Sequence, residues 1–121
     1  MSKAMGAAAR VEVLPDMEGT RVIVCSGEFD METEGALRQA LDTAHRDGTT
    51  LTVVDLAGVS FADSSMLNTL IGAHNRQPLV LAGPLAQQVI RLLEVTGTDS
   101  FFHLAADANS ARATSPAVAP R

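Results

Sequence analysis

Two compact apolar segments, LTVVDL (51–56) and PLVLAG (78–83), are separated by a stretch whose apolar residues recur at helical spacing. Short, nearly uninterrupted apolar segments are typical of strands that are buried on both faces, as they are in parallel sheets. Parallel neighbours need a crossover between them, and the usual crossover is a helix. This feature therefore predicts an α/β fold with a mostly parallel sheet.

The remaining strands are predicted from alternation and from turn residues. RVEVL (10–14) alternates between apolar and polar residues, and RVIVCSG (21–27) is a more apolar segment. Pro15 and the turn-forming residues after it separate the two segments, which suggests a hairpin with an antiparallel first strand. FFHL (101–104) is expected to form a short last strand.

Three helices are expected, because apolar residues recur three and four residues apart in three stretches. Asp63 is the expected N-cap of the second helix, and Gly48 and Gly97 are placed to end the first and the third. Pro84 suits the first turn of the third helix. The three apolar stripes are Leu37, Ala40, Leu41 and Ala44; Leu67, Leu70, Ile71 and His74; and Leu85, Val89, Leu92 and Leu93, and the candidate caps of the first helix are Asp30 and Thr33.

The expected order of elements is therefore β-β-α-β-α-β-α-β. We expect one α/β domain over residues 10–105, with a mixed, mostly parallel sheet of about five strands and three or four helices. Residues 1–9 are expected to be a flexible N-terminus. Residues 106–121 are rich in Ala, Ser and Pro without periodicity, and they are expected to be a flexible tail.

Charge and hydropathy exclude some classes of partner. The chain has 14 acidic and 9 basic residues, a formal net charge of −5, whereas binding to nucleic acid or to anionic lipid requires a basic surface. No apolar run approaches the roughly 18 residues of a membrane-spanning helix, and the start, MSKAMGAAAR, has no apolar core of signal-peptide length. We expect a soluble, cytoplasmic protein that is a monomer or a weak dimer and that contacts neither nucleic acid nor membrane.

No arrangement of residues typical of an enzyme is visible. His45, His74 and His103 lack metal-ligand spacing, and neither of the common glycine-rich phosphate loops occurs. His74 lies on an apolar stripe, which favours a structural, partly buried histidine. Cys25 is the only cysteine and lies within a strand, so we expect a buried, inert thiol and no intrachain disulfide. The expectation is a protein without catalytic activity, cofactor or metal.

Two segments that follow strands are the candidates for function, because functional residues in such sheets collect at the carboxyl ends of strands. They are SGEFD (26–30) and GVSFADSS (58–65). Asp63 followed by Ser64 is a common way to begin a helix, but a helix N-terminus also favours a phosphate group. A phosphoryl group on Ser64 would add nearly two negative charges and would meet Asp63 and Asp30.

These segments resemble those of a known family. GEFD (27–30) resembles the GELD-type loop of STAS domains, and VVDLAGVSFADSSMLNTL (53–70) resembles their DLSGVxFxDSSGLxxL segment. LAGPLAQQVIRLLEVTGTDSFFHL (81–104) is similar to their strand, last helix and final strand. The resemblance covers residues 10–105 and implies a STAS-like fold. It is best to the stand-alone anti-sigma factor antagonists, which implies an anti-sigma factor of the serine-kinase type as the partner.

The resemblance also implies roles for individual residues. Ser64, the first serine of the trio, would be phosphorylated by the partner, which would end the interaction, while Asp63 caps the helix. Met66 stands where the family usually has Gly, so it could obstruct the kinase or fill a groove of the partner. Phe29 and Met66 are the expected apolar anchors, with a core position as the alternative for Phe29. The expected contact surface is Glu28, Phe29, Asp30, Ser60, Asp63, Ser64, Ser65 and Met66.

A second reading within the same family remains open. Some STAS domains are adaptor subunits of other complexes, such as a lipid-transport ATPase or a stressosome, and they act without phosphorylation. The short link AHNRQP (73–78), where family members usually have a longer basic helix end, suggests that part of the surface differs in partner choice.

Overall fold

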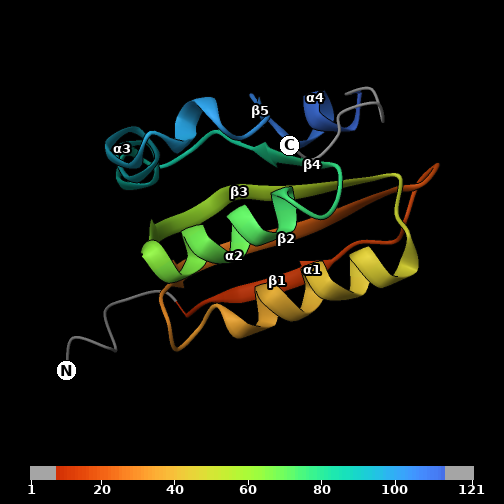
Figure 1. The fold of residues 1–121 in the computed structure, drawn as a ribbon, viewed down its shortest axis with the longest axis horizontal. Helices are drawn as coiled ribbons and strands as arrows, with labels where there is room; N and C mark the ends of the chain where they lie inside the picture. Colours follow the sequence, from red (N-terminus) through yellow and green to blue (C-terminus); the bar gives the residue numbers. More distant parts are fainter. Residues whose placement is uncertain (1–7, 114–121) are drawn as a thin grey trace.

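The computed structural model describes residues 8–113 (Figure 1). Ten elements follow one another in the order expected for alternating strands and helices. They are β1 (Arg10–Val13), β2 (Thr20–Phe29), α1 (Gly35–Asp47), β3 (Leu51–Ala62), α2 (Ser64–His74), β4 (Leu79–Ala82), α3 (Gln87–Thr96), the 3-10 helix η2 (Thr98–Ser100), β5 (Leu104–Ala105) and α4 (Ala108–Arg112).

The five strands form one mixed sheet in the order β1-β2-β3-β4-β5. β1 is antiparallel to β2, and every other neighbouring pair is parallel, so the expected α/β class and the N-terminal hairpin are confirmed. Successive parallel strands are added on the same side, and right-handed crossovers then place the intervening helices on one face of the sheet. Figure 1 shows α1 and α2 side by side on that face.

Alternation along the strands divides the apolar residues between the two faces. Ile23, Val54 and Leu81 point to the face that α1, α2 and α3 cover, and they belong to the larger core cluster. Val53 and Val80 point to the other face, where α4 covers them. Both faces of the central strands are therefore buried, which explains their nearly continuous apolar sequences.

The C-terminal ends of α1 and α3 were predicted correctly, and the single thiol lies in the core. Gly48 and Gly97 adopt the left-handed conformation as the C-caps of α1 and α3, which glycine reaches without steric cost. Cys25 is fully buried, and burial raises the pKa of its thiol to about 12. His74 is buried as well, and its ring packs against the rings of Phe101 and His103.

The segment around the third helix differs from the expectation. Pro84 follows a cis peptide bond and lies before the helix, which begins at Gln87 with Ala86 as its N-cap. The last strand of the sheet is only Leu104–Ala105 rather than 101–104.

The segment that follows β5 was expected to be flexible, and this was wrong for its first part. The Asp107 side chain accepts a hydrogen bond from the Ser110 amide at 2.7 Å and so begins α4. Ala111 of this helix is fully buried against the second face of the sheet. Burial of a small apolar residue on an otherwise open sheet face explains why so short a helix forms. The rest of the expected tail, 114–121, and residues 1–7 lie outside the described residues.

Candidate functional site

The two candidate segments, 26–30 and 58–65, were expected to follow strands as loops but are themselves largely strand. β2 continues to Phe29 and β3 to Ala62, and the two remain paired to their ends, with Glu28 opposite Phe61 and Phe29 opposite Ala62. The pairing shifts register twice, between Val24 and Ser26 and between Gly27 and Glu28. Extra residues on one strand of a pair increase its twist and change the direction of its side chains. The candidate site therefore lies on the paired ends of two core strands.

Gly58 is needed at the first of these irregularities. A Cβ atom at this position would lie 2.9 Å from the Cβ atom of Ser26 and 3.2 Å from the carbonyl oxygen of Cys25. Real Cβ contacts are hardly ever so close, so a larger residue would push the two strands apart. The glycine allows β2 and β3 to stay paired on the way to the site.

Asp63 connects the end of β3 with the start of α2. Its backbone is extended, and its carboxylate accepts hydrogen bonds from the amides of Ser65 at 2.9 Å and Met66 at 3.3 Å, as expected of an N-cap. Its own amide donates to the carbonyl oxygen of Phe29 at 3.2 Å. This backbone bond joins the two candidate segments directly.

The two serines after the cap lie in different surroundings. Ser64 is the first residue of α2 and is exposed, whereas Ser65 is half-buried. Ser60 and Glu28, both expected at the contact surface, are also exposed. An exposed hydroxyl in the first turn of a helix is accessible to a modifying enzyme, and the positive end of the helix dipole favours a phosphate there.

Asp30 stabilises the turn between β2 and α1. Its carboxylate oxygen Oδ1 accepts hydrogen bonds from the amides of Glu32 at 2.9 Å and Thr33 at 3.1 Å, and the Asp30 amide donates to the Thr33 hydroxyl at 2.9 Å. The expectation that Asp30 or Thr33 caps α1 was wrong, because the N-cap is Glu34, which makes no side-chain cap bond. The two side chains instead hold the turn before the helix. Asp30 lies at the same edge of the sheet as Asp63, because Phe29 and Ala62 are paired.

Two of the expected contact residues are buried. Phe29 is 0% exposed and Met66 is 1% exposed, and both belong to the main core cluster. Phe29 points to the same face of the sheet as Ile23 and Cys25, as the alternation along β2 requires. Met66 lies on the inner face of α2, four residues before Leu70. The expectation that Phe29 and Met66 are exposed apolar anchors was therefore wrong, and the alternative for Phe29, a core position, is correct.

Other apolar side chains are exposed at this edge. Met31, in the turn after β2, is 75% exposed, and Phe61, beside Glu28, is 40% exposed. Sequence reasoning missed both. Neighbouring residues of a strand point to opposite faces, so an exposed Phe61 could have been predicted if Ala62 had been recognised as buried. The exposure of Met31 could have been predicted because it lies among polar residues in the turn after β2.

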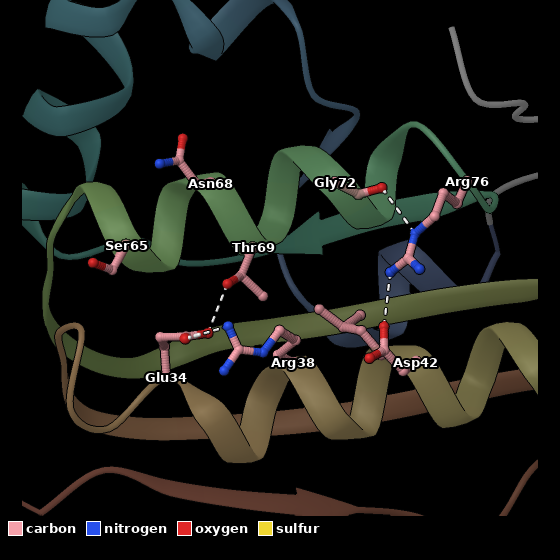
Figure 2. A pocket seen from close by; sticks show the side chains of 9 residues that line it. Glu34, Arg38, Asp42, Ser65, Asn68, Thr69, Gly72 and Arg76 are labelled. Atoms are coloured by element: carbon pink, nitrogen blue, oxygen red, sulfur yellow. Dashed lines mark hydrogen bonds and ion pairs between the residues drawn. The ribbon is translucent and has the colours of Figure 1, made fainter.

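A groove with a volume of about 530 Å³ runs between α1 and α2 (Figure 2). At one end the buried carboxylate of Glu34 accepts a hydrogen bond from the Thr69 hydroxyl at 2.7 Å and pairs with Arg38 at 2.8 Å. At the other end Arg76 pairs with Asp42 at 2.8 Å, and this hydrogen bond lowers the pKa of the Asp42 carboxyl. The lining residues are Glu34, Arg38, Leu41, Asp42, Ser65, Asn68, Thr69, Gly72 and Arg76.

The edge is acidic on the side of the candidate serine. Residues 26–34 and 57–66 contain five carboxylates and no lysine or arginine. Within residues 8–113, His, Cys, Asp and Glu side chains form no group of three or more that could hold a metal ion, and no helix is long and apolar enough to cross a membrane. This edge offers charge and apolar contact for recognition, together with the exposed side chains of Ser60 and Ser64.

Comparison with known proteins places this arrangement in a family. The family model described as "Mlab, STAS domain" matches residues 15–105, most of the chain. The chain belongs to the STAS domain family. The matched residues run from before β2 to the end of β5 and include the Asp63-Ser64-Ser65 trio.

This STAS domain is similar to proteins that are named as anti-sigma factor antagonists. Anti-sigma-B factor antagonists from several strains of Staphylococcus aureus are 31% identical over 83 residues, which is 64% of this chain and 76% of theirs. The crystal structure of an anti-sigma factor antagonist from Mycobacterium paratuberculosis has a TM-score of 0.78 at 27% identity and covers 88% of this chain and 92% of its own.

The fold is also shared with a more distant antagonist. SpoIIAA in its unphosphorylated form has a TM-score of 0.69 at 20% identity, over 83% of this chain and 91% of its own. The phosphorylated form of Bacillus SpoIIAA has a TM-score of 0.63 at 19% identity, over 83% of this chain and 95% of its own. At this level of identity the likeness concerns the fold alone.

Proposed function

We propose that this STAS domain is an anti-sigma factor antagonist that binds an anti-sigma factor of the serine-kinase type and is switched off by phosphorylation at Ser64. The observation that carries the proposal is the exposed hydroxyl of Ser64, held in the first turn of α2 at an acidic edge of the sheet. The names of the Staphylococcus aureus and Mycobacterium paratuberculosis relatives support the choice of partner.

The proposed contact surface is built around this serine. Its polar part is Glu28, Asp30, Ser60, Asp63, Ser64 and Ser65, as expected from the sequence, and its apolar part is Met31 and Phe61 in place of the buried Phe29 and Met66. Exposed apolar groups surrounded by polar ones often mark interfaces. The partner would present a basic surface with an apolar pocket, which complements these charges.

Phosphorylation would end binding by local electrostatics. A phosphoryl group carries close to two negative charges, and Asp63 lies directly beside Ser64. When a partner covers the site, its basic groups would already pair with the carboxylates of this edge, so the added charge would be desolvated without a further cation to compensate it. The fold need not change, because the Ser64 hydroxyl is not part of the cap that Asp63 forms.

The burial of Met66 supports this switch. At 1% exposure its side chain lies beneath α2 rather than beside Ser64. A kinase approaching the hydroxyl would not meet it, although the family usually has Gly there.

The second candidate is an adaptor that binds another complex through the same surface without phosphorylation. The description of the matching family model, which names Mlab rather than an anti-sigma function, favours keeping it. Such an adaptor would be captured with transport or stressosome proteins rather than with a kinase.

The test is a pull-down from the native host, with mass spectrometry of the bait, followed by titration of the captured partner. We expect wild type and Ser64→Ala to bind equally, Ser64→Asp to bind about tenfold more weakly, and ATP to weaken only wild-type binding. Ser100→Asp, which adds the same charge to an exposed serine of η2, is the matched control. Equal affinity for all variants with no phosphate on Ser64 would refute the switch.

A further inference from the structure

A side chain of α3 is hydrogen-bonded to the backbone immediately before the Asp63-Ser64-Ser65 trio. The amide of Ala62 donates to Oε1 of Gln88 at 2.9 Å, and Nε2 of Gln88 donates to the carbonyl oxygen of Ala62 at 2.8 Å. Both backbone groups of one residue are thus bound by both ends of one side-chain amide. Sequence reasoning assigned Gln88 no role.

Gln88 does for β3 what a neighbouring strand would do. The pairing of β3 with β4 ends at Asp55 opposite Ala82, but β3 continues beyond this pair to Ala62. On its other side, β3 stays paired with β2 to the end. A primary amide presents one donor and one acceptor with the spacing of a peptide group, so Gln88 replaces the missing strand at Ala62.

The bonds around Ala62 also fix Ser64. Ala62 is held from the side of α3, the Asp63 amide is held by Phe29 from the side of β2, and the Asp63 carboxylate caps α2. Ser64 follows directly after these two residues. The position of Ser64 relative to β2, and relative to the turn that follows β2, therefore depends on α3. This helix lies on the other side of β3.

We propose that Gln88 is a positioning residue for the Ser64 site, so that α3 sets where the phosphorylated hydroxyl stands relative to the rest of the contact surface. The positioning itself is a property of the fold, while its effect on binding and phosphorylation rests on the proposed function. The amide is essential to the proposal, because an ionised carboxylate cannot donate to the Ala62 carbonyl and an aliphatic side chain can neither donate nor accept.

The first experiment needs no partner. Amide hydrogen exchange of Ala62 is measured by NMR in wild type, Gln88→Leu and Gln88→Glu, with Gln87→Glu as the control on an exposed neighbour of the same helix. We expect Ala62 exchange to be about tenfold faster in Gln88→Leu and in ionised Gln88→Glu, with unchanged exchange in the middle of β3. Exchange at the wild-type rate in both variants would overturn the proposal.

The pH profile separates positioning from simple loss of packing. The protonated carboxyl group of the Gln88→Glu variant has one donor and one acceptor, as the glutamine amide does. Protection of Ala62 in this variant should therefore recover as the pH falls through the carboxyl pKa, about 4.3 or above in this half-buried place. Wild type and Gln87→Glu should show no such recovery. If Gln88→Leu does not fold, the pH dependence of Ala62 protection in Gln88→Glu alone tests the proposal. Fast Ala62 exchange that does not slow as the pH falls would count against it.

The functional experiment uses the purified anti-sigma kinase. We expect Gln88→Leu to raise the KM for phosphorylation of Ser64 by about tenfold with a smaller change in kcat, because docking of the displaced serine is impaired. Equal KM values in the two proteins, with faster Ala62 exchange, would refute the effect on the site. If wild type itself is not phosphorylated, the proposed function fails, and the exchange experiment still decides whether Gln88 positions the backbone.

Discussion

Ser64 and Met66 are two residues apart on α2 but lie in opposite surroundings, one exposed and the other in the core. The helical turn between them explains the difference. The resemblance to the family gives the position of each residue in the motif. It does not give the direction of the Met66 side chain, because the family usually has glycine at that position. The side-chain direction depends on how α2 is rotated against the sheet.

Substitution of Met31 and Met66 by alanine should have opposite effects. Met31→Ala is expected to weaken partner binding by about tenfold and to leave stability within about 0.5 kcal/mol of wild type, because the side chain is 75% exposed. Met66→Ala should lower the free energy of unfolding by about 2–5 kcal/mol, since it leaves a cavity in the core. Urea unfolding and titration of the partner measure the two quantities. Strong destabilisation by Met31→Ala would contradict the assignment.

The N-cap at Asp63 gives a second prediction at this scale. Asp63→Ala removes the acceptor for two amides of α2 and should lower the free energy of unfolding by about 1 kcal/mol, whereas Asp63→Asn should lower it by less. Urea unfolding of the two variants is the measurement. Glu94→Ala, at an exposed position late in α3, serves as the control. Equal stabilities of Asp63→Ala and the control would argue against the cap.

At the scale of elements, a buried chain of polar side chains connects α1, β3 and the segment after α2. The Thr52 hydroxyl donates to Oε1 of Gln77 at 2.9 Å, and Nε2 of Gln77 donates to the carbonyl oxygen of Leu41 at 3.1 Å. Buried polar groups are stabilising when they are paired and unfavourable when they lose a partner. The side-chain amide of Gln77 therefore joins α1 and β3 to the segment after α2.

Gln77→Ala should consequently lower the free energy of unfolding by about 1–3 kcal/mol, because the Leu41 carbonyl and the Thr52 hydroxyl both lose a partner. Gln87→Ala, on the exposed side of α3, should change it by less than about 0.5 kcal/mol. Chemical denaturation of the two alanine variants gives the comparison. A Gln77→Ala protein as stable as the control would show that water replaces the lost bonds.

The elements that were predicted and those that were missed differ in what stabilises them. The stripe around Leu41 and the glycine after α1 are local signals, and the structure has the helix they indicate. The continuation of β3 to Ala62 depends on pairing with β2 across two register shifts, and α4 depends on burying Ala111. Neither condition is visible in the local sequence. The bonds of Gln88 to Ala62 were missed for the same reason, since the two residues are distant in sequence.

For the molecule as a whole, the ion pairs of Arg21 connect the turn after β1 with the end of α1. Arg21 pairs with Asp16 at 2.7 Å and with Asp47 at 2.9 Å, and its hydrogen bond lowers the pKa of the Asp16 carboxyl. A lowered pKa in the folded state contributes stability that is present above the unfolded pKa of about 3.9 and is lost as the pH falls through the folded value. Because the carboxylates are largely solvated, the contribution is small.

Arg21→Met, which keeps an apolar side chain, should therefore be less stable than wild type at pH 7, and the difference should shrink by up to about 1 kcal/mol as the pH falls below about 4. Urea unfolding of both proteins over this pH range measures it. Arg91→Met, at an exposed position of α3, should differ from wild type by a constant amount. A difference for Arg21→Met that does not change with pH would exclude the linkage.

The pairing of β2 and β3 up to Phe29 and Ala62 has a consequence for the rates of association and dissociation. A partner that meets the ends of paired core strands, rather than mobile loops, orders little chain on binding, so encounter is governed by diffusion and by the charge of the acidic edge. Added negative charge strengthens long-range attraction to a basic partner even while it disfavours the final contact. Phosphorylation would then keep the association rate at least as high and shorten the lifetime of the complex, and the association rate would fall as ionic strength rises.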